Sequence, residues 1–217
     1  MKTVRVFFEK TGRAVYISHL DLTRAMARAL ARSEIPVWYT EGFHPHLYLT
    51  FALPLSLGTV GLRETMDYRL LDDGYPLEEA TRRLDAALPE GLHAVKTVDP
   101  VMQPKQIMWA DYALALRCDF AQAKAAFDAL AALPALPMEK RGKKGVRTVD
   151  IRPLFSVLSV EKSPKGALVR LRCRAGVETN LNPSLVLDAA RERAGFEALA
   201  VLMTRVAVLD ANCCDFL

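Results

Sequence analysis

The chain has 217 residues, of which 51% are hydrophobic and 25% are charged, and its formal net charge at pH 7 is +4. This composition is typical of a globular protein with one or two apolar cores. Because no apolar stretch approaches the roughly 18 residues of a transmembrane helix, and the N-terminus MKTVRVFFEK has no signal-peptide cleavage site, we expect a soluble, cytoplasmic protein without a membrane span.

The first half alternates between strand-like and helix-like patterns. Residues 3–10 alternate and are rich in β-branched and aromatic side chains, which predicts a strand. Residues 18–33 carry apolar side chains at helical spacing, and residues 76–88 begin a second helix with a proline and two acids. Further strands are predicted at 35–40, 47–55, 64–71 and 93–98.

The second half repeats this order. Residues 111–118 predict a strand, and the alanine-rich stretch 121–133 predicts a helix. The helix predicted at 182–195 has Asn182 as its N-cap and Gly195 beyond its last turn. Further strands are predicted at 146–160, 167–175 and 201–209.

Each half therefore has the order β-α-β-β-α-β of a ferredoxin-like domain. We predict an α+β protein with tandem ferredoxin-like (βαββαβ) domains and antiparallel sheets, at residues 1–100 and 108–217, joined where two prolines interrupt the pattern. Such domains leave one sheet face free of helices, and RNA-recognition modules use that face. The fold alone does not decide the function.

The turn at 42–46 reads GFHPH and joins two predicted strands. Pro45 holds His44 in an extended conformation, and Gly42 supplies a permissive backbone. In an extended chain His44 and His46 point to opposite sides, so the turn is a poor metal site and we predict no metal. His44 is a candidate general base at the end of a sheet. The residues expected to shape this site are Gly42, Phe43 and Pro45.

The first predicted helix begins with the sequence S-H-L-D. Ser18 and Asp21 form a capping box, which explains the pattern without any site. His19 lies in the first helical turn, where free N–H groups attract anions and where an imidazole can act as acid or base. Both interpretations stay open: capping alone, or a site that Ser18 and Asp21 help to shape and that includes His19 as a second candidate base.

The positive charge is concentrated in the second half. Residues 1–110 carry 13 Lys and Arg against 13 Asp and Glu, whereas residues 111–217 carry 16 against 12. The basic segment 140–152 predicts either a phosphate-bearing partner or a solvated hairpin tip. The basic stripe on the helix at 18–33 is either the solvent-exposed face of that helix or a surface that binds a phosphate backbone. The residues predicted to bind nucleic acid are Arg24, Arg28, Arg32, Lys140, Arg141, Lys143, Lys144, Arg147 and Arg152, with Asp150 shaping the site.

Several familiar chemistries have no motif in this chain. There is no phosphate-binding loop, no dinucleotide fingerprint, no zinc-protease motif and no C-x-x-C pair, so we predict no cofactor. Cys213 and Cys214 are interpreted as free thiols, with a redox or soft-metal pair as the alternative. Aromatic residues near the 42–46 turn either stack on bases or belong to the core.

The S-H-L-D helix start, the G-F-H-P turn, the P-L-x-L-G run and the later V-D-I-R-P segment together resemble a bacterial family of radical-SAM-linked proteins of unknown function. Members of that family are often encoded beside, or fused to, a cobalamin-binding radical SAM protein. The resemblance implies a cytoplasmic bacterial protein with a radical SAM partner, and the family's gene neighbourhoods imply RNA as its substrate. Leu47 and Gly61 depart from the family pattern.

These observations lead to one main hypothesis and two alternatives. We expect a protein that is not an enzyme on its own, and that binds or presents RNA to a radical SAM enzyme for modification or processing. The first alternative is a metal-independent RNA endonuclease on a paired ferredoxin-like fold, with His19 or His44 as the base. The second is a protein-interaction adaptor that binds no RNA.

Overall fold

The structure is a computed structural model that describes residues 1–142 and 145–217, and at residues 140–142 and 146 it describes the backbone alone. The chain divides into two compact units: unit 1, residues 1–106 with 215–217, and unit 2, residues 107–214. In the described part of the chain four α-helices accompany mostly antiparallel strands, so the predicted α+β class is confirmed. None of the described helices is long and apolar enough to cross a membrane.

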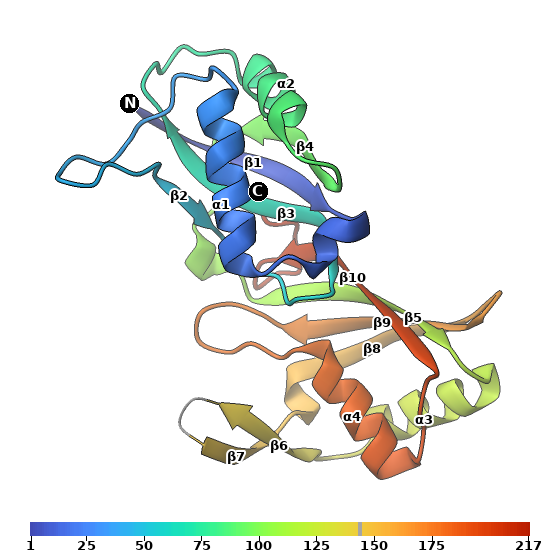
Figure 1. The fold of residues 1–217 in the computed structure, drawn as a ribbon. Helices are drawn as coiled ribbons and strands as arrows, with labels where there is room; N and C mark the ends of the chain where they lie inside the picture. Colours follow the sequence, from blue (N-terminus) through green and yellow to red (C-terminus); the bar gives the residue numbers. More distant parts are fainter. Residues whose placement is uncertain (143–144) are drawn as a thin grey trace. The chain divides into compact units, whose positions relative to one another are not determined.

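Unit 1 contains a four-stranded antiparallel sheet with two helices. The order across the sheet is β4-β1-β3-β2, and α1 and α2 lie side by side on it (Figure 1). Short 3-10 turns, η1 and η2, occur at Gly12–Tyr16 and Pro104–Gln106. The main elements are β1 (Lys2–Lys10), α1 (His19–Arg32), β2 (Leu49–Phe51), β3 (Val60–Leu70), α2 (Leu77–Ala87) and β4 (Leu92–Val98).

The core of unit 1 follows the two-residue period of its strands. Val4, Val6 and Phe8 of β1 are buried and pack with Leu22 and Met26 of α1. Because alternate strand residues point to opposite faces, the remaining residues of β1 lie on the face away from the helices. The sequence pattern therefore decides which sheet face the helices cover.

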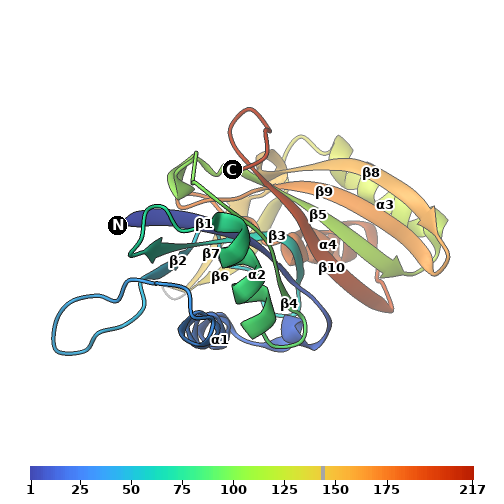
Figure 2. The same cartoon turned by 90° about the horizontal axis from the view of Figure 1, so that it is seen from above.

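The strands predicted at 35–40 and 47–55 are much shorter in the structure. The first is reduced to isolated bridges at Val37 and Tyr39, and the second leaves only the three residues of β2. Pro36 has no N–H to donate to a ladder, which disfavours a regular strand there. The segment between α1 and β2 instead forms a long loop that extends away from the sheet of unit 1 (Figures 1 and 2).

Unit 2 repeats the order of unit 1 with an inserted hairpin. Its four-stranded sheet is antiparallel with the order β10-β5-β9-β8, and a separate hairpin pairs β6 with β7. Helix α3 packs on β8, β9 and α4. The elements are β5 (Trp109–Arg117), α3 (Phe120–Ala132), β6 (Pro137–Gly142), β7 (Gly145–Asp150), β8 (Phe155–Ser163), β9 (Gly166–Arg174), α4 (Pro183–Ala194) and β10 (Ala200–Leu209).

Two local predictions in unit 2 have different outcomes. The helix caps of α4 are confirmed: the side chain of Asn182 accepts a hydrogen bond from the Ser184 N–H, and Gly195 adopts the left-handed conformation. The strand material at 146–160 is interrupted, because a 3-10 turn at Arg152–Leu154 separates β7 from β8. Pro153 in that turn cannot donate to a ladder, which is why one continuous strand does not form.

Candidate nucleic-acid interface

One face of the unit 2 sheet carries no helix. On β5 the buried residues Ala110, Tyr112, Leu114 and Leu116 occupy alternate positions and belong to the core beneath α3 and α4. The residues between them on β5 point to the opposite face of the sheet, and so do the residues paired with those β5 residues on the adjacent strands. This helix-free face consists of Trp109, Asp111, Ala113, Ala115 and Arg117 on β5, Leu168, Arg170, Arg172 and Arg174 on β9, Ser159 and Glu161 on β8, and Leu202 and Thr204 on β10.

A row of arginines runs along β9 on the helix-free face. Arg172 forms two hydrogen bonds with the Asp111 carboxylate, Nε–Oδ1 at 2.8 Å and Nη2–Oδ2 at 2.9 Å, and this pairing raises the pKa of the guanidinium. The guanidinium of Arg174 lies 4.8 Å from the centre of the Trp109 ring, a cation–π contact. Arg170 is exposed and lies 3.6 Å from a Glu161 carboxylate oxygen. Three guanidinium groups thus lie on the helix-free face, where Arg170 is exposed and Arg172 and Arg174 are half-buried.

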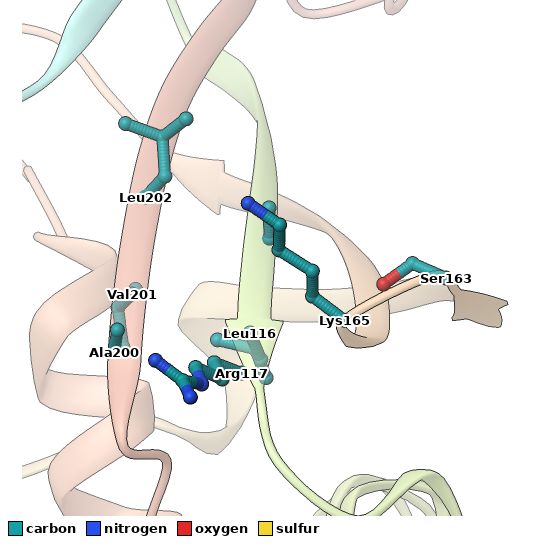
Figure 3. Close-up of a pocket in the computed structure, with 8 residues that line it drawn as sticks. Leu116, Arg117, Ser163, Lys165, Ala200, Val201 and Leu202 are labelled. Atoms are coloured by element: carbon teal, nitrogen blue, oxygen red, sulfur yellow. The ribbon is translucent and has the colours of Figure 1, made fainter.

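A cavity of about 740 Å³ lies at one end of the helix-free face (Figure 3). The cations Arg117 and Lys165 line it, together with Val201 and the aliphatic side chain of Leu202 on β10. Neither cation forms an ion pair with any residue that the structure describes, and no acidic residue is part of the lining. The other lining residues are Ala115, Leu116, Ser163 and Ala200.

The turn between β8 and β9 brings Lys165 to this cavity because of one glycine. Gly166 has φ of +145° and pairs with Arg117 across the ladder. A Cβ at this position would lie 2.5 Å from the Leu116 carbonyl oxygen and 2.6 Å from the Cys118 nitrogen. Only glycine fits this combination of conformation and close approach, so it fixes the turn beside Arg117.

The helix-free face of unit 1 is differently built. Arg5 and Phe7 of β1 lie on it, and their exposed fractions are only 1% and 3%. The Arg5 guanidinium contacts the carbonyl oxygens of Met102 and Leu217 and lies 4.3 Å from the Phe216 ring centre. Segments of unit 1 itself therefore cover Arg5, whereas Arg117 and Arg170 of unit 2 are exposed.

The predicted site at the start of α1 is a helix cap. The Ser18 hydroxyl accepts a hydrogen bond from the Asp21 N–H at 3.1 Å and donates one to the Asp21 carboxylate at 2.7 Å. That hydroxyl hydrogen bond is the main reason that the pKa of Asp21 is lowered. The exposed His19 ring makes an edge contact with Phe51, with centroids 5.0 Å apart. The capping interpretation of Ser18 and Asp21 is confirmed.

The predicted turn at 42–46 is the tip of the long loop between α1 and β2. Thr40 and His46 close it, with the Thr40 N–H bonded to the His46 carbonyl at 2.8 Å and the hydroxyl 2.9 Å from His46 Nδ1. Gly42 has φ of +122°, and Phe43 is fully exposed. Among the described residues, no hydrogen bond or ring contact joins His19 to His44. The two candidate bases and Pro45 therefore form no shared constellation.

The basic stripe on α1 divides into different environments. Arg24 pairs with Asp21 at 3.4 Å, and Arg28 is exposed. Arg32 donates to the Ala87 carbonyl at 2.8 Å, so it caps the end of α2. Because Arg24 and Arg32 already contact groups of unit 1, the stripe favours a structural role over a continuous phosphate-binding surface.

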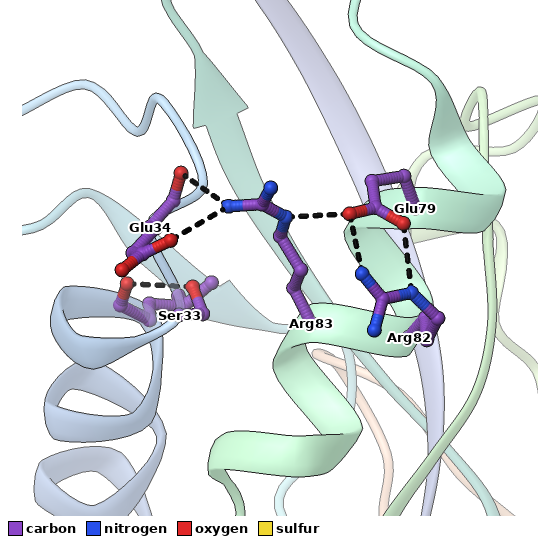
Figure 4. Close-up of polar contacts among 6 residues, drawn as sticks. Ser33, Glu34, Glu79, Arg82 and Arg83 are labelled. Atoms are coloured by element: carbon purple, nitrogen blue, oxygen red, sulfur yellow. Dashed lines mark hydrogen bonds and ion pairs between the residues drawn. The ribbon is translucent and has the colours of Figure 1, made fainter.

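Near Arg32 a second polar cluster joins α1 to α2. Arg83 bridges Glu34, at 3.1 Å, and Glu79, at 2.6 Å (Figure 4). Glu79 also accepts two hydrogen bonds from Arg82, and these lower its pKa to about 2. A shallow cavity of about 460 Å³ lies over this cluster. Because both glutamates already neutralise the arginines, the cluster links the two helices rather than offering free charge.

The basic segment 140–152 is only partly described. Lys143 and Lys144 lie outside the described residues, as do the side chains of Lys140 and Arg141. Arg147 is exposed on β7. That Lys140, Arg141, Lys143 and Lys144 bind nucleic acid therefore stays a prediction.

Asp150 and Arg152 are engaged with the backbone of unit 2. The Asp150 carboxylate accepts from the N–H groups of Leu136, at 2.7 Å, and Arg152, at 3.0 Å; the first of these is the main cause of its lowered pKa. The Arg152 guanidinium donates to three carbonyls, including those of Ala131 and Leu133 at the end of α3. Both residues hold the end of α3 against the β7–β8 connection.

The environments of the cysteines bear on their reactivity. Cys213 and Cys214 are exposed, and burial raises the pKa of the Cys173 thiol to about 12. Within residues 1–142 and 145–217, no group of three His, Cys, Asp or Glu side chains is arranged to hold a metal ion.

Sequence reasoning missed the residues of the helix-free face and its cavity. A signal for part of it was present, because Arg170, Arg172 and Arg174 alternate in ALVRLRCRA and must share a face of any strand. That Arg117 and Lys165 line the same cavity, in contrast, depends on pairing between distant strands.

Comparison with known proteins adds a family. A family model described as "Uncharacterized protein conserved in bacteria (DUF2344)" matches residues 3–183 of the chain. No curated protein matches it.

Two solved structures show distant similarity. An unknown protein from Galdieria sulphuraria is 14% identical, with 93% of this chain and 95% of that chain covered and a TM-score of 0.28. A CRISPR-associated protein from Thermus thermophilus is 15% identical, with 87% and 89% covered and a TM-score of 0.19.

Proposed function

We propose that this chain, which belongs to the DUF2344 family of uncharacterized bacterial proteins, binds single-stranded RNA on the helix-free face of unit 2. The observation that carries the proposal is the arginine row on that face, Arg170, Arg172 and Arg174, with Trp109 beneath one of the guanidinium groups. Phosphates of an RNA strand lying across the sheet would contact Arg170 and Arg174, and the indole and Leu168 would contact bases.

A single strand suits this face better than a duplex. A sheet face offers a shallow surface on which unpaired bases can lie flat, while flanking guanidinium groups contact the backbone. Arg170 lies near a single acid, at 3.6 Å, so a phosphate can compete for it. Arg172 is held by two short bonds to Asp111, and in this proposal it positions the row while Arg170 and Arg174 reach the strand.

The tandem ferredoxin-like interpretation is part of the proposal. In each unit the chain runs strand, helix, strand, strand, helix, strand. Across each sheet the fourth of these strands lies next to the first, the first next to the third, and the third next to the second. The β6–β7 hairpin is an insertion in unit 2. This arrangement supports a ferredoxin-like assignment for both units. It accounts for why each sheet has a helix-free face.

The role within a reaction follows from the sequence resemblance. The protein would hold an RNA segment and present it to a separate radical SAM enzyme that performs the chemistry, rather than act on the RNA itself. This partnership is tested with purified components: addition of the protein should raise modification of the same RNA by a radical SAM enzyme from the same organism. Unchanged modification in the presence of saturating protein would refute the partnership and leave RNA binding unaffected.

RNA binding is tested by fluorescence anisotropy with a short labelled single-stranded RNA. We expect an affinity that falls steeply as salt rises from about 50 to about 200 mM, because phosphate contacts release counterions. In Arg170→Glu the affinity should fall, and the slope of log affinity against log salt should become shallower by about 0.7 for the lost contact.

The matched control is Lys124→Glu, on the exposed surface of α3 on the other side of the unit 2 sheet. Among the described residues Lys124 pairs with Asp128 alone, at 2.7 Å, so the substitution changes the net charge equally without touching the helix-free face. Equal loss in both variants would mean that net charge, rather than this face, determines binding. Gel analysis of the recovered RNA shows whether it is cut; cleavage lost in His19→Ala or His44→Ala would support the endonuclease alternative instead.

A further inference from the structure

The cavity beside Arg117 differs from the rest of the helix-free face in its charge. Arg170 and Arg172 each face a carboxylate, whereas Arg117 and Lys165 have no ion pair among the described residues and share a lining without acids. Two uncompensated cations at one small site suit a doubly charged anion better than a single negative charge. An internal phosphodiester carries one negative charge, while a terminal phosphomonoester carries nearly two at neutral pH.

The opposite wall of the cavity is aliphatic. Leu202 has an exposed fraction of 54% and lies opposite Ala115 across the β10–β5 ladder, so these two side chains and Ala200 form an aliphatic patch on the face that carries Arg117 (Figure 3). Such a wall binds a flat apolar surface, and the face of a nucleobase is one. The volume of about 740 Å³ lies within the range of small-ligand sites and accommodates one nucleotide.

The position of the cavity points to the end of an RNA strand as its ligand. It lies where β5 ends at Arg117 and β10 begins at Ala200, and the β8–β9 turn carrying Ser163 and Lys165 bounds it. An RNA strand that follows the arginine row along β9 reaches this turn at the edge of the sheet. The strand would therefore terminate there rather than continue.

We propose that this cavity binds the terminal nucleotide of single-stranded RNA, with its phosphomonoester on Arg117 and Lys165 and its base on Leu202 and Ala115. The inference rests on the proposed RNA-binding function and specifies the ligand: RNA with a phosphorylated end. The chemistry is the same for a 5′- or a 3′-phosphate, and the experiment distinguishes the two.

The test compares three RNAs of one sequence, bearing a 5′-phosphate, a 3′-phosphate or hydroxyl groups at both ends, with an internal fluorophore. We expect one of the two phosphorylated RNAs to bind about tenfold more tightly than the hydroxyl form, as is typical of charge-assisted hydrogen bonds to a dianion. In the double variant Arg117→Gln, Lys165→Gln this preference should disappear, while binding of the hydroxyl RNA remains. Both residues are exposed, so the variant should fold normally, which circular dichroism checks.

Arg170→Gln is the matched control, because it removes one cation from the face outside the cavity. It should weaken all three RNAs by a similar factor and keep the preference. A free-ligand measurement adds a second readout: adenosine monophosphate should bind the wild type more tightly than inorganic phosphate does, and Leu202→Ser should narrow that difference.

The possible outcomes separate the two proposals. Equal affinity for all three RNAs would overturn the terminal-nucleotide site and leave RNA binding by the face intact. A preference that survives in the double variant would also overturn it, because the phosphate would then bind elsewhere. Failure of the wild type to bind any of the RNAs would overturn both proposals.

Discussion

The Arg5 guanidinium forms two parallel hydrogen bonds with the Asp67 carboxylate, with Nε 2.7 Å from Oδ1 and Nη2 2.8 Å from Oδ2. The pair joins neighbouring positions on β1 and β3, and the exposed fraction of Arg5 is 1%. The remaining nitrogen, Nη1, donates to the carbonyl oxygens of Met102 and Leu217. A buried charge with this many partners is an anchor for the segments that cover the sheet of unit 1.

Removal of the charge of Asp67 should destabilise the protein strongly. We expect Asp67→Asn to lower the free energy of unfolding by about 3 kcal/mol, because a buried guanidinium loses its counterion. Urea denaturation measures the change. The control is Asp215→Asn, which removes the exposed partner of Arg63, 2.7 Å away, and should cost less than about 1 kcal/mol. Similar losses in both variants would mean that burial of Arg5 adds nothing to the pair.

The sequence predicts well those features that depend on neighbouring residues. Ser18 with Asp21, and Asn182 with Gly195, indicate helix ends because a cap needs only a few consecutive residues, and all four are confirmed. The order of strands and helices is readable from local periodicity for most of the chain, but no strand was predicted at Pro137–Gly142, where β6 forms the inserted hairpin with β7. The predicted strand around Val37 is wrong in extent, because ladder formation depends on partners elsewhere in the chain and on the missing N–H of Pro36.

The candidate site depends on contacts that no local pattern contains. Arg152 was a candidate for nucleic-acid binding, yet its guanidinium donates to Ala131 and Leu133, about 20 residues upstream. Conversely, Arg117 and Lys165 carry no motif and become neighbours only because β5 pairs with β9. Charge can be counted from the sequence, but whether it is free or already engaged is a property of the fold.

The Ser18 cap provides a test of the start of α1. Ser18→Ala should lower the free energy of unfolding by about 1 kcal/mol, since the Asp21 N–H loses its acceptor. Ser18→Asn should retain nearly full stability, because asparagine caps equally well. Thermal and urea unfolding measure both variants. If the asparagine variant were as unstable as the alanine variant, the serine would contribute something other than a cap.

The glycine beside the cavity provides a third prediction. Gly166→Ala should destabilise the protein by more than about 3 kcal/mol, because it combines an unfavourable φ with a Cβ 2.5 Å from the Leu116 carbonyl oxygen. Gly42→Ala shares the positive φ, +122°, but its Cβ meets nothing within 4 Å, so the loss should be confined to backbone strain. The difference between the two unfolding free energies measures the steric part. Equal losses would show that the β8–β9 turn relaxes to accept a side chain.

The Glu79 cluster predicts a dependence of stability on pH. Hydrogen bonds from Arg82 and Arg83 lower the pKa of Glu79 from 4.5 to about 2 in the folded protein. Because the folded pKa lies below the unfolded one, the contribution of Glu79 is fully present above about pH 4.5 and is lost as pH falls towards 2. Between these values the unfolding free energy of the wild type should therefore fall more than that of Glu79→Gln.

The control for this last prediction is Glu78→Gln, which removes the same charge from the preceding position of α2. Glu78 is exposed and has no ion pair among the described residues, so its variant should follow the pH dependence of the wild type. Urea denaturation at several pH values between 2 and 6, at constant ionic strength, makes the comparison. If Glu79→Gln lost as much stability as the wild type across that range, its arginine contacts would not persist in solution, and the link between α1 and α2 through Arg83 would have to be abandoned.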